Sequence, residues 1–138
     1  LYILDNAGEI VCDKLLIEQL DCPETWCVVR KAPIINDVTR EDAEAVGLGR
    51  LAKIVDIGVE ALGVPLNHCS PEFRDLFASA DLVISKGQAN FETLDEADRP
   101  IFHILRAKCE HMANFLGVPL GSAILVKTPR DHEAEKHE

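Results

Sequence analysis

Short apolar runs alternate along this chain with longer stretches in which apolar and polar residues mix. The runs have the length of strands, and the mixed stretches have the length and spacing of helices. We predict strands at residues 1–4, 26–30, 53–56, 82–85, 101–105 and 123–127, and helices at 9–20, 40–46, 71–78 and 107–116. Such alternation is typical of β-α-β units, so the predicted fold class is α/β, a three-layer αβα sandwich with a mostly parallel, Rossmann-like sheet.

Residues at the predicted helix ends support these boundaries. Thr39 can cap the helix that begins at residue 40, and Ser70 can cap a helix with Pro71 in its first position. Gly117 can end the last helix. The run at 101–105 has an alternative interpretation, because it can also begin the helix that follows it.

Length and composition predict one domain. The chain has 138 residues, of which 47% are hydrophobic, enough for one core. We assign residues 1–128 to this domain and expect the polar tail at 129–138 to be disordered. Because Leu1 already lies inside a predicted strand, we also expect that an N-terminal portion of the natural protein is missing.

Charge and cysteine content narrow the function classes. With 14 basic and 24 acidic residues the formal net charge is −10, which disfavours non-specific binding to nucleic acid or to an anionic membrane. A phosphate ligand must therefore be attracted locally, by a metal, a lysine or a helix N-terminus. The five cysteines form no Cys-x-x-Cys pair, and no signal peptide or membrane-spanning run is present. We predict reduced thiols in a cytoplasmic protein.

Oxygen-bearing side chains follow two of the predicted strands. Asp5 and Asn6 come directly after the first apolar run, and Asn36 and Asp37 follow the second. Ligands of open parallel sheets collect beyond the carboxyl ends of the strands, so these residues can converge on one ion. Asp5, Asn6 and Asp37 would suit magnesium, manganese or another hard divalent cation. No clustered Cys and His ligands indicate a structural zinc site.

The turn after the first strand has two interpretations. In the segment from Asp5 to Glu9, Gly8 allows a tight strand-to-helix turn whose free N–H groups and helix dipole would face Asp5. Alternatively, Asp5 or Asn6 only caps the helix, which is about equally consistent with the local sequence.

A lysine and a glycine follow the fourth strand. In the segment from Lys86 to Glu92, the Lys86 amine can bind phosphate, Gly87 permits a tight turn, and Gln88 and Asn90 can bind substrate hydroxyls or hold the turn. The fixed spacing of a Walker loop is absent. A plain surface turn is the alternative.

Lys108 lies between the fifth apolar run and the last predicted helix. A lysine in this place is usually solvated on a helix face. If it faced the crevice, it would supply a second cation for a phosphoryl group. Cys109 beside it is better explained as a small core residue than as a nucleophile.

Together these segments resemble the damage-control phosphatase family, catalogued as domain of unknown function 89, and in particular its short stand-alone prokaryotic branch. The similarity rests on Leu-Asp-Asn-Ala-Gly-Glu at 4–9, Pro-Ile-Ile-Asn-Asp-Val-Thr at 33–39, the segment 81–92 that begins at Asp81 and ends in Lys-Gly-Gln-Ala-Asn-Phe-Glu, and Leu-Arg-Ala-Lys-Cys at 105–109. It extends in order from residue 1 to about residue 127.

The resemblance implies a phosphatase that needs a divalent metal (magnesium, manganese, cobalt or nickel) and acts on small phosphorylated metabolites, such as sugar phosphates or damaged cofactor intermediates. It implies that Asp5, Asn6 and Asp37 are metal ligands and, with Lys86, the catalytic residues. The candidate substrate-binding residues are Gly8, Asn36, Lys86, Gly87, Gln88, Ala89, Asn90, Glu92 and Lys108.

Two features depart from the family pattern. Ala89 stands where the family has glycine, which predicts a tighter loop and weaker phosphate binding. The helical region that precedes the first strand in family members is also missing from this sequence. The expected partners are therefore that N-terminal region or a second copy of the chain, besides the small substrate.

The sequence leaves the mechanism and two alternative functions open. Asp5 either attacks phosphorus directly or serves throughout as a metal ligand while water attacks. An S-adenosylmethionine-dependent methyltransferase is the first alternative, although no Gly-x-Gly-x-x-Gly follows the first strand and only fold analogy favours it. A non-catalytic fragment that binds metal or phosphate and needs the missing region is the second.

Overall fold

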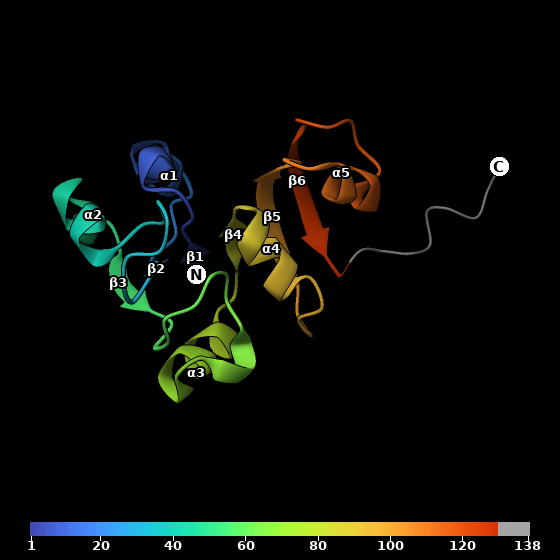
Figure 1. Cartoon of the computed structure of the whole chain (residues 1–138). Helices are drawn as coiled ribbons and strands as arrows, with labels where there is room; N and C mark the ends of the chain where they lie inside the picture. Colours follow the sequence, from blue (N-terminus) through green and yellow to red (C-terminus); the bar gives the residue numbers. More distant parts are fainter. Residues whose placement is uncertain (130–138) are drawn as a thin grey trace.

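The computed structural model describes residues 1–129, which contain a six-stranded sheet in the order β3-β2-β1-β4-β5-β6 (Figure 1). The strands are β1 (Tyr2–Ile3), β2 (Trp26–Val29), β3 (Lys53–Asp56), β4 (Ile84–Lys86), β5 (Ile101–Arg106) and β6 (Ala123–Thr128). β1 to β5 are parallel, and β6 runs antiparallel to β5. The mostly parallel α/β sheet predicted from the sequence is confirmed. Except for Pro129, the tail predicted at 129–138 lies outside the described residues.

Helices connect the strands much as the pattern predicted. They are α1 (Ile10–Gln19), α2 (Arg40–Ala45), α3 (Pro71–Ser79), α4 (Gln88–Leu94) and α5 (Glu110–Leu116), with short 3-10 turns η1 (Ala7–Glu9), η2 (Leu48–Arg50) and η3 (Leu66–His68). The Thr39 side chain accepts from the Asp42 N–H in a capping box, and the Ser70 side chain accepts from the Phe73 N–H. Gly117 ends α5 with a φ of 68°. All three predicted helix ends are confirmed.

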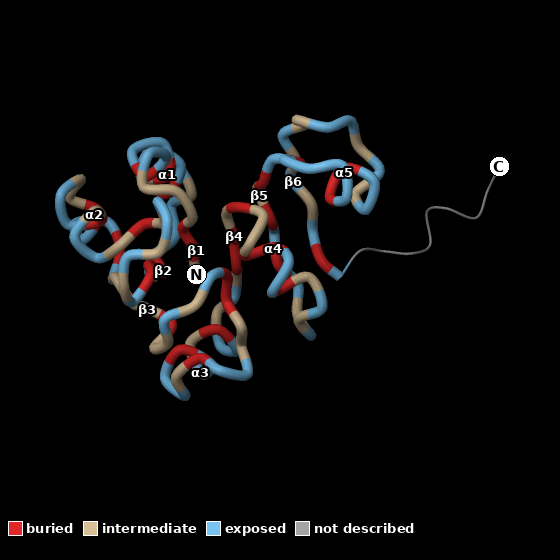
Figure 2. Tube along the Cα trace, viewed as in Figure 1, coloured by how far each residue is buried: buried red, intermediate tan, exposed pale blue. Residues whose placement is uncertain are grey.

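Two apolar cores cover the two faces of the sheet, because successive side chains of a strand point to opposite faces. Tyr2 and Leu4 pack on one face with residues of α1 and α2, such as Ile10 and Ala43. Ile3 packs on the other face. That second core contains Phe73 and Phe77 of α3 and Leu94 of α4, and a smaller cluster beside it includes Met112 of α5. Figure 2 shows the buried positions concentrated along the strands and the inner sides of the helices.

The outer half of the sheet is less covered on one face. Phe102 of β5 is 37% exposed and Leu125 of β6 is 69% exposed, whereas Ile101 and Leu105 on the opposite face of β5 are buried. No helix among residues 1–129 is long and apolar enough to cross a membrane.

The strand order gives a switch point between β1 and β4, and the space beyond the carboxyl ends of these strands is termed the crevice. From β1 the chain continues to β2 and β3 on one side, and then crosses to β4 and β5 on the other side. The carboxyl ends of β1 and β4 therefore lie side by side at the point where the winding direction reverses. Ligands of doubly wound sheets bind at this point. The segments from Asp5 and from Lys86 begin there.

Candidate active site at the strand switch point

Asp5 is the central carboxylate of the crevice. Its main-chain oxygen accepts from the Val38 N–H at 2.8 Å, which fixes the residue beside the loop that carries Asp37. Burial raises the pKa of the Asp5 carboxyl, and the negative charge of Asp37 raises it further, although Lys108 and Arg30 act in the opposite direction. Asp5 and Asp37 therefore lie close enough to repel each other. In a half-buried position, that repulsion favours a proton or a cation between them.

Backbone pairing joins Asn6 to the Asp37 loop. Asn6 and Asp37 form an isolated antiparallel bridge, and the Ala7 N–H donates to the Asn36 main-chain oxygen at 2.8 Å. The Asn6 Oδ1 accepts from the Gly8 N–H at 2.7 Å, so Asn6 also caps the 3-10 turn η1. Asp5, Asn6 and Asp37 are thus brought to one place by two segments about thirty residues apart in the sequence.

Three of the N–H groups expected to be free beside Asp5 are engaged, so the expectation was wrong for Ala7, Gly8 and Glu9. The N–H groups of Ala7 and Gly8 are engaged as above, and that of Glu9 donates to the Asn6 main-chain oxygen at 3.0 Å. The turn is closed by its own hydrogen bonds. The N–H groups of these three residues are therefore not available to attract a phosphate.

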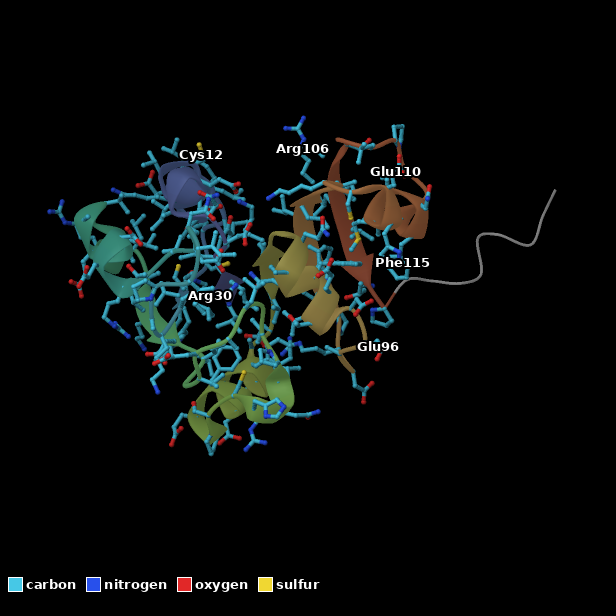
Figure 3. All side chains as sticks on the ribbon, in the orientation of Figure 1. Cys12, Arg30, Glu96, Arg106, Glu110 and Phe115 are labelled. Carbon is cyan, nitrogen blue, oxygen red and sulfur yellow. The ribbon has the colours of Figure 1, made fainter. Side chains whose placement is uncertain are left out.

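Arg30 connects the two sides of the crevice from a buried position (Figure 3). Its Nε donates to Asp37 Oδ2 at 2.6 Å, its Nη1 to the Gly63 main-chain oxygen at 2.7 Å, and its Nη2 to Asn90 Oδ1 at 2.8 Å. The Arg30 and Asp37 side chains are only 3% and 8% exposed. One guanidinium therefore orients the Asp37 carboxylate and neutralises part of its charge.

Asn90 completes this connection on the side of β4. Its Nδ2 donates to the main-chain oxygens of Leu4 at 3.1 Å and of Lys86 at 2.7 Å, at the ends of β1 and β4. The residue is fully buried, and its three polar contacts use both amide hydrogens and the oxygen. Of the two roles predicted for Asn90, the structure shows that it holds the backbone; contact with a substrate would require these bonds to break.

The tight turn predicted at Gly87 is confirmed, but the residues after it form a helix that the sequence did not predict. Gly87, with φ 86° and ψ 161°, precedes α4, which contains Gln88, Ala89, Asn90 and Glu92. The Gln88 Nε2 donates to Glu92 Oε1 at 2.8 Å and to the Cys109 Sγ at 3.6 Å, so Gln88 also reaches the loop after β5. Ala89 is partly buried. A Cβ atom added at Gly63 would lie only 2.6 Å from the Ala89 main-chain oxygen.

The two predicted cations differ in their surroundings. Lys86 ends β4, and its Nζ donates to Asp13 Oδ1 at 2.7 Å and to Glu9 Oε2 at 2.8 Å. Lys108 is exposed in the loop between β5 and α5, close enough to Asp5 to lower its pKa. The predicted helix at 107–116 begins only at Glu110, so Lys108 lies in a loop at a strand end.

A separate pocket lies at the opposite end of the strands, beside their amino ends. It has a volume of about 390 Å³ and is lined by Leu1, Trp26 and Leu82 near the amino ends of their strands. None of the residues predicted for the functional site lines it, and its lining is mostly apolar side chains. The residues predicted for the functional site lie at the carboxyl ends of the strands instead.

The chain also matches the model of a known protein family. That model, of the damage-control phosphatase ARMT1-like domain, matches residues 1–124. The chain belongs to this family. The resemblance drawn from the four sequence segments is thereby confirmed.

Several archaeal proteins are similar to this family member. It is 44% identical to a damage-control phosphatase of Pyrococcus horikoshii over 92% of this chain, and 38% identical to a damage-control phosphatase of Archaeoglobus fulgidus over 89%. A Pyrococcus horikoshii crystal structure described as a DUF89 family protein superposes with a TM-score of 0.86 at 42% identity. That match covers 91% of this chain and 46% of that one. The chain spans 46% and 44% of the two phosphatases, less than half their length.

Three residues of the family member's crevice were missed by sequence reasoning. Arg30 was assigned to the end of a strand, Asp13 to a helix, and Glu9 only to a helix start. One signal was present: Asp13 falls between Ile10 and Ile17 on the buried stripe of α1. A carboxylate in such a stripe needs a partner. The partner could not be named, because Lys86 is 73 residues further along the chain.

Proposed function

We propose that this chain is a divalent-metal-dependent phosphatase domain that hydrolyses phosphate monoesters of small metabolites. The observation that carries the proposal is the half-buried Asp5 carboxylate, which faces Asp37 at the switch point and has a raised pKa. Lys108 is close enough to Asp5 to lower its pKa, and Lys86 ends the neighbouring strand β4. This set of side chains therefore contains carboxylates that can bind a metal cation and lysines that can bind a phosphate. Sugar phosphates and damaged cofactor intermediates are the substrate classes we propose.

The donor atoms fit a hard divalent ion. Two carboxylates that repel each other and the carboxamide of Asn6 offer oxygen ligands of the kind that magnesium and manganese prefer, and cobalt or nickel also accept. Among residues 1–129 no group of three or more His, Cys, Asp or Glu residues is arranged to hold a metal. A site with only two carboxylates and one amide leaves coordination positions for water and phosphate. When bound, such an ion supplies charge neutralisation for phosphoryl oxygens.

The side chains of the crevice have separable roles in this proposal. Asp5 and Asp37 provide the negative charge that attracts the cation, and Arg30 orients Asp37. Lys86 and Lys108 stabilise the charge that spreads over the phosphoryl oxygens in the transition state. Asp5 either attacks phosphorus, which would leave an aspartyl-phosphate, or remains a ligand while water attacks.

The relatives support the proposal through their names, since two of them are damage-control phosphatases. Their activity belongs to proteins more than twice as long as the matched region. For this chain, hydrolysis and the identity of its substrate are therefore proposals.

The test is hydrolysis of an aryl phosphate by metal-stripped protein, with magnesium, manganese, cobalt or nickel added back. We expect activity that requires a metal and that is lost in Asp5→Asn and in Asp37→Asn. Lys86→Ala should raise KM and lower kcat/KM. Asp75→Asn, which changes an exposed aspartate of α3, is the matched control and should keep full activity. Unchanged turnover in Asp5→Asn would refute the assigned site.

Thermal denaturation with and without manganese gives a second readout that needs no turnover. Manganese should stabilise the natural sequence but not Asp5→Asn. Stabilisation without hydrolysis would mean that this chain forms the binding site but requires further protein for catalysis, which was the second alternative raised by the sequence. Absence of both effects would remove the metal from the proposal.

A further inference from the structure

The Lys86 ammonium is held by two carboxylates that differ sharply in exposure. Its Nζ lies 2.7 Å from Asp13 Oδ1 and 2.8 Å from Glu9 Oε2. The Lys86 and Asp13 side chains are 12% and 3% exposed, whereas the Glu9 side chain is 48% exposed. In this state the cation predicted to bind phosphate is already neutralised by the chain's own acids.

Asp13 is a fixed partner. Its Oδ1 also accepts from the Tyr2 hydroxyl at 2.7 Å, and burial together with this hydrogen bond raises the pKa of Tyr2, which therefore stays protonated as the donor. The Asp13 Oδ2 is buried without a hydrogen-bond partner among the described residues. Separation of Asp13 from Lys86 would leave a buried charge uncompensated, which proteins tolerate poorly.

Glu9 is a different kind of partner. It lies in the short turn η1, its carboxylate is half-exposed, and the only hydrogen bond of that carboxylate within residues 1–129 comes from Lys86 Nζ. It can exchange this contact for water at little cost, as exposed ion-pair partners do. Its charge also raises the pKa of Asp5, so Glu9 lies near that carboxylate and not on a remote surface.

We propose that Glu9 occupies Lys86 as a displaceable internal anion, and that a phosphate group entering the crevice replaces it while Asp13 keeps the amine in place. This inference rests on the proposed function, since it assigns the phosphate to that same crevice. Lys86 exchanges one half-exposed carboxylate for a phosphate. Glu9 thereby sets a threshold that favours doubly charged phosphate over weaker anions, because each ligand must outcompete a carboxylate.

The protonation of Lys86 agrees with this arrangement. Burial by itself would lower the pKa of the Lys86 amine, but its hydrogen bonds to Asp13 and Glu9 raise the pKa above the usual value. After Glu9 has moved away, Asp13 still stabilises the charged form. Lys86 then meets the phosphate as an ammonium group.

The test measures binding of inorganic phosphate by calorimetry, in the presence and absence of manganese, to the whole chain and its variants. Glu9→Gln should bind phosphate more tightly by up to about fivefold, the upper end of the range expected for loss of one competing exposed ion pair. Glu18→Gln removes the same charge from an exposed position of the adjoining helix, α1, and should leave affinity unchanged. Asp13→Asn should weaken binding, because the Lys86 amine loses the buried carboxylate that holds it in place. Equal or weaker phosphate binding by Glu9→Gln overturns the proposal even if Asp13→Asn fails to fold.

A double-mutant cycle with Lys86→Gln separates direct competition from a general field effect. The gain from Glu9→Gln should vanish in the Lys86→Gln background, because no amine remains to be released. A gain that persists there would overturn the proposal. Lysine side-chain NMR adds a readout independent of turnover: phosphate should perturb the Lys86 Nζ signal, and an unperturbed signal would also overturn the proposal. Neither measurement requires hydrolysis, so failure of the phosphatase assay leaves them interpretable.

Discussion

Gly87 lies directly against the carboxylate of Asp5. A Cβ atom at position 87 would lie 2.5 Å from Asp5 Oδ1 and closer still to Cγ and Oδ2. The end of β4 thus forms one wall of the space in which the acid of β1 stands. The φ of 86° and ψ of 161° at Gly87 also belong to a region that only glycine adopts readily.

Gly87→Ala should therefore displace Asp5 as well as strain the backbone. We expect a loss of about 3 kcal/mol or more in the free energy of unfolding, together with loss of manganese-dependent stabilisation. Gly121→Ala is the matched control, because Gly121 has the same φ of 86° but no atom within 4 Å of the position that a Cβ would take. It should cost only the conformational strain, about 1–2 kcal/mol. Equal losses in urea denaturation of the two variants would contradict the contact with Asp5.

Arg30→Met should be among the most destabilising single substitutions in the chain. It leaves the buried Asp37 carboxylate and the Asn90 Oδ1 without their donor, and removal of one partner from a buried ion pair costs about 3–5 kcal/mol. Arg30→Lys should recover part of this, since an ammonium restores charge but not three directed bonds. Arg50→Met, at an exposed position, is the control and should change stability by less than about 0.5 kcal/mol. A loss below about 1 kcal/mol for Arg30→Met in urea denaturation would refute the role assigned to Arg30.

His103 should make the protein sensitive to mild acid. The side chain is fully buried on β5, its Nε2 contacts the Thr128 Oγ1 at 3.0 Å, and burial lowers its pKa to about 4 from 6.5. The unfolded chain takes up a proton on this ring below pH 6.5, whereas the folded chain does so only near pH 4. The stability that depends on neutral His103 is therefore intact above pH 6.5, and about 3 kcal/mol of it is lost as pH falls to about 4.

The measurement is the free energy of unfolding at several pH values between these limits. His103→Gln should show a shallower decline with falling pH than the natural sequence, whatever its stability at neutral pH. His68→Gln, at an exposed histidine, should keep the steep decline. Parallel curves for the natural sequence and His103→Gln would mean that the ring does not titrate as its burial requires.

Substitution of Ile35 should stabilise the protein, because the backbone at this residue is strained. It is a β-branched residue with a φ of 51°, and its side chain is 86% exposed in the loop before Asp37. Asparagine tolerates the left-handed region better, so Ile35→Asn should stabilise the fold by about 1 kcal/mol in chemical denaturation. Leu120→Asn, an exposed position outside that region, should give no gain. Destabilisation by Ile35→Asn would show instead that the isoleucine side chain makes a contact of its own.

Most of the fold was accessible from the sequence because its signals are local. The apolar runs at 26–30 and 53–56 coincide with β2 and β3 to within one residue, and Thr39 and Ser70 cap the helices as predicted. α4 was missed because its seven residues present only Phe91 and Leu94 as large apolar side chains, one turn apart. That is too short for a helical period to be recognised among polar residues.

The candidate site was predictable only in part, for a physical reason. Asp5, Asp37 and Lys86 could be placed at one edge, because the carboxyl ends of parallel strands share it. The hydrogen-bond and ion-pair partners of each charged side chain depend on three-dimensional packing. Arg30 reaches Asn90 across 60 residues, and Lys86 reaches Glu9 across 77 residues. No local pattern encodes such pairs.

The switch point between β1 and β4 is also where the N-terminal and C-terminal halves of the sheet meet. Only two register pairs, Tyr2 with Ile84 and Ile3 with Ser85, join these strands within the described sheet. The acids that face the proposed cation precede the crossover from β3, and Lys86 and Lys108 follow it. A chain divided in the loop at residues 58–65 would therefore yield two pieces with complementary halves of the chemistry. Phosphate binding by the mixed pieces would then report their reassociation, as in a split-enzyme complementation assay.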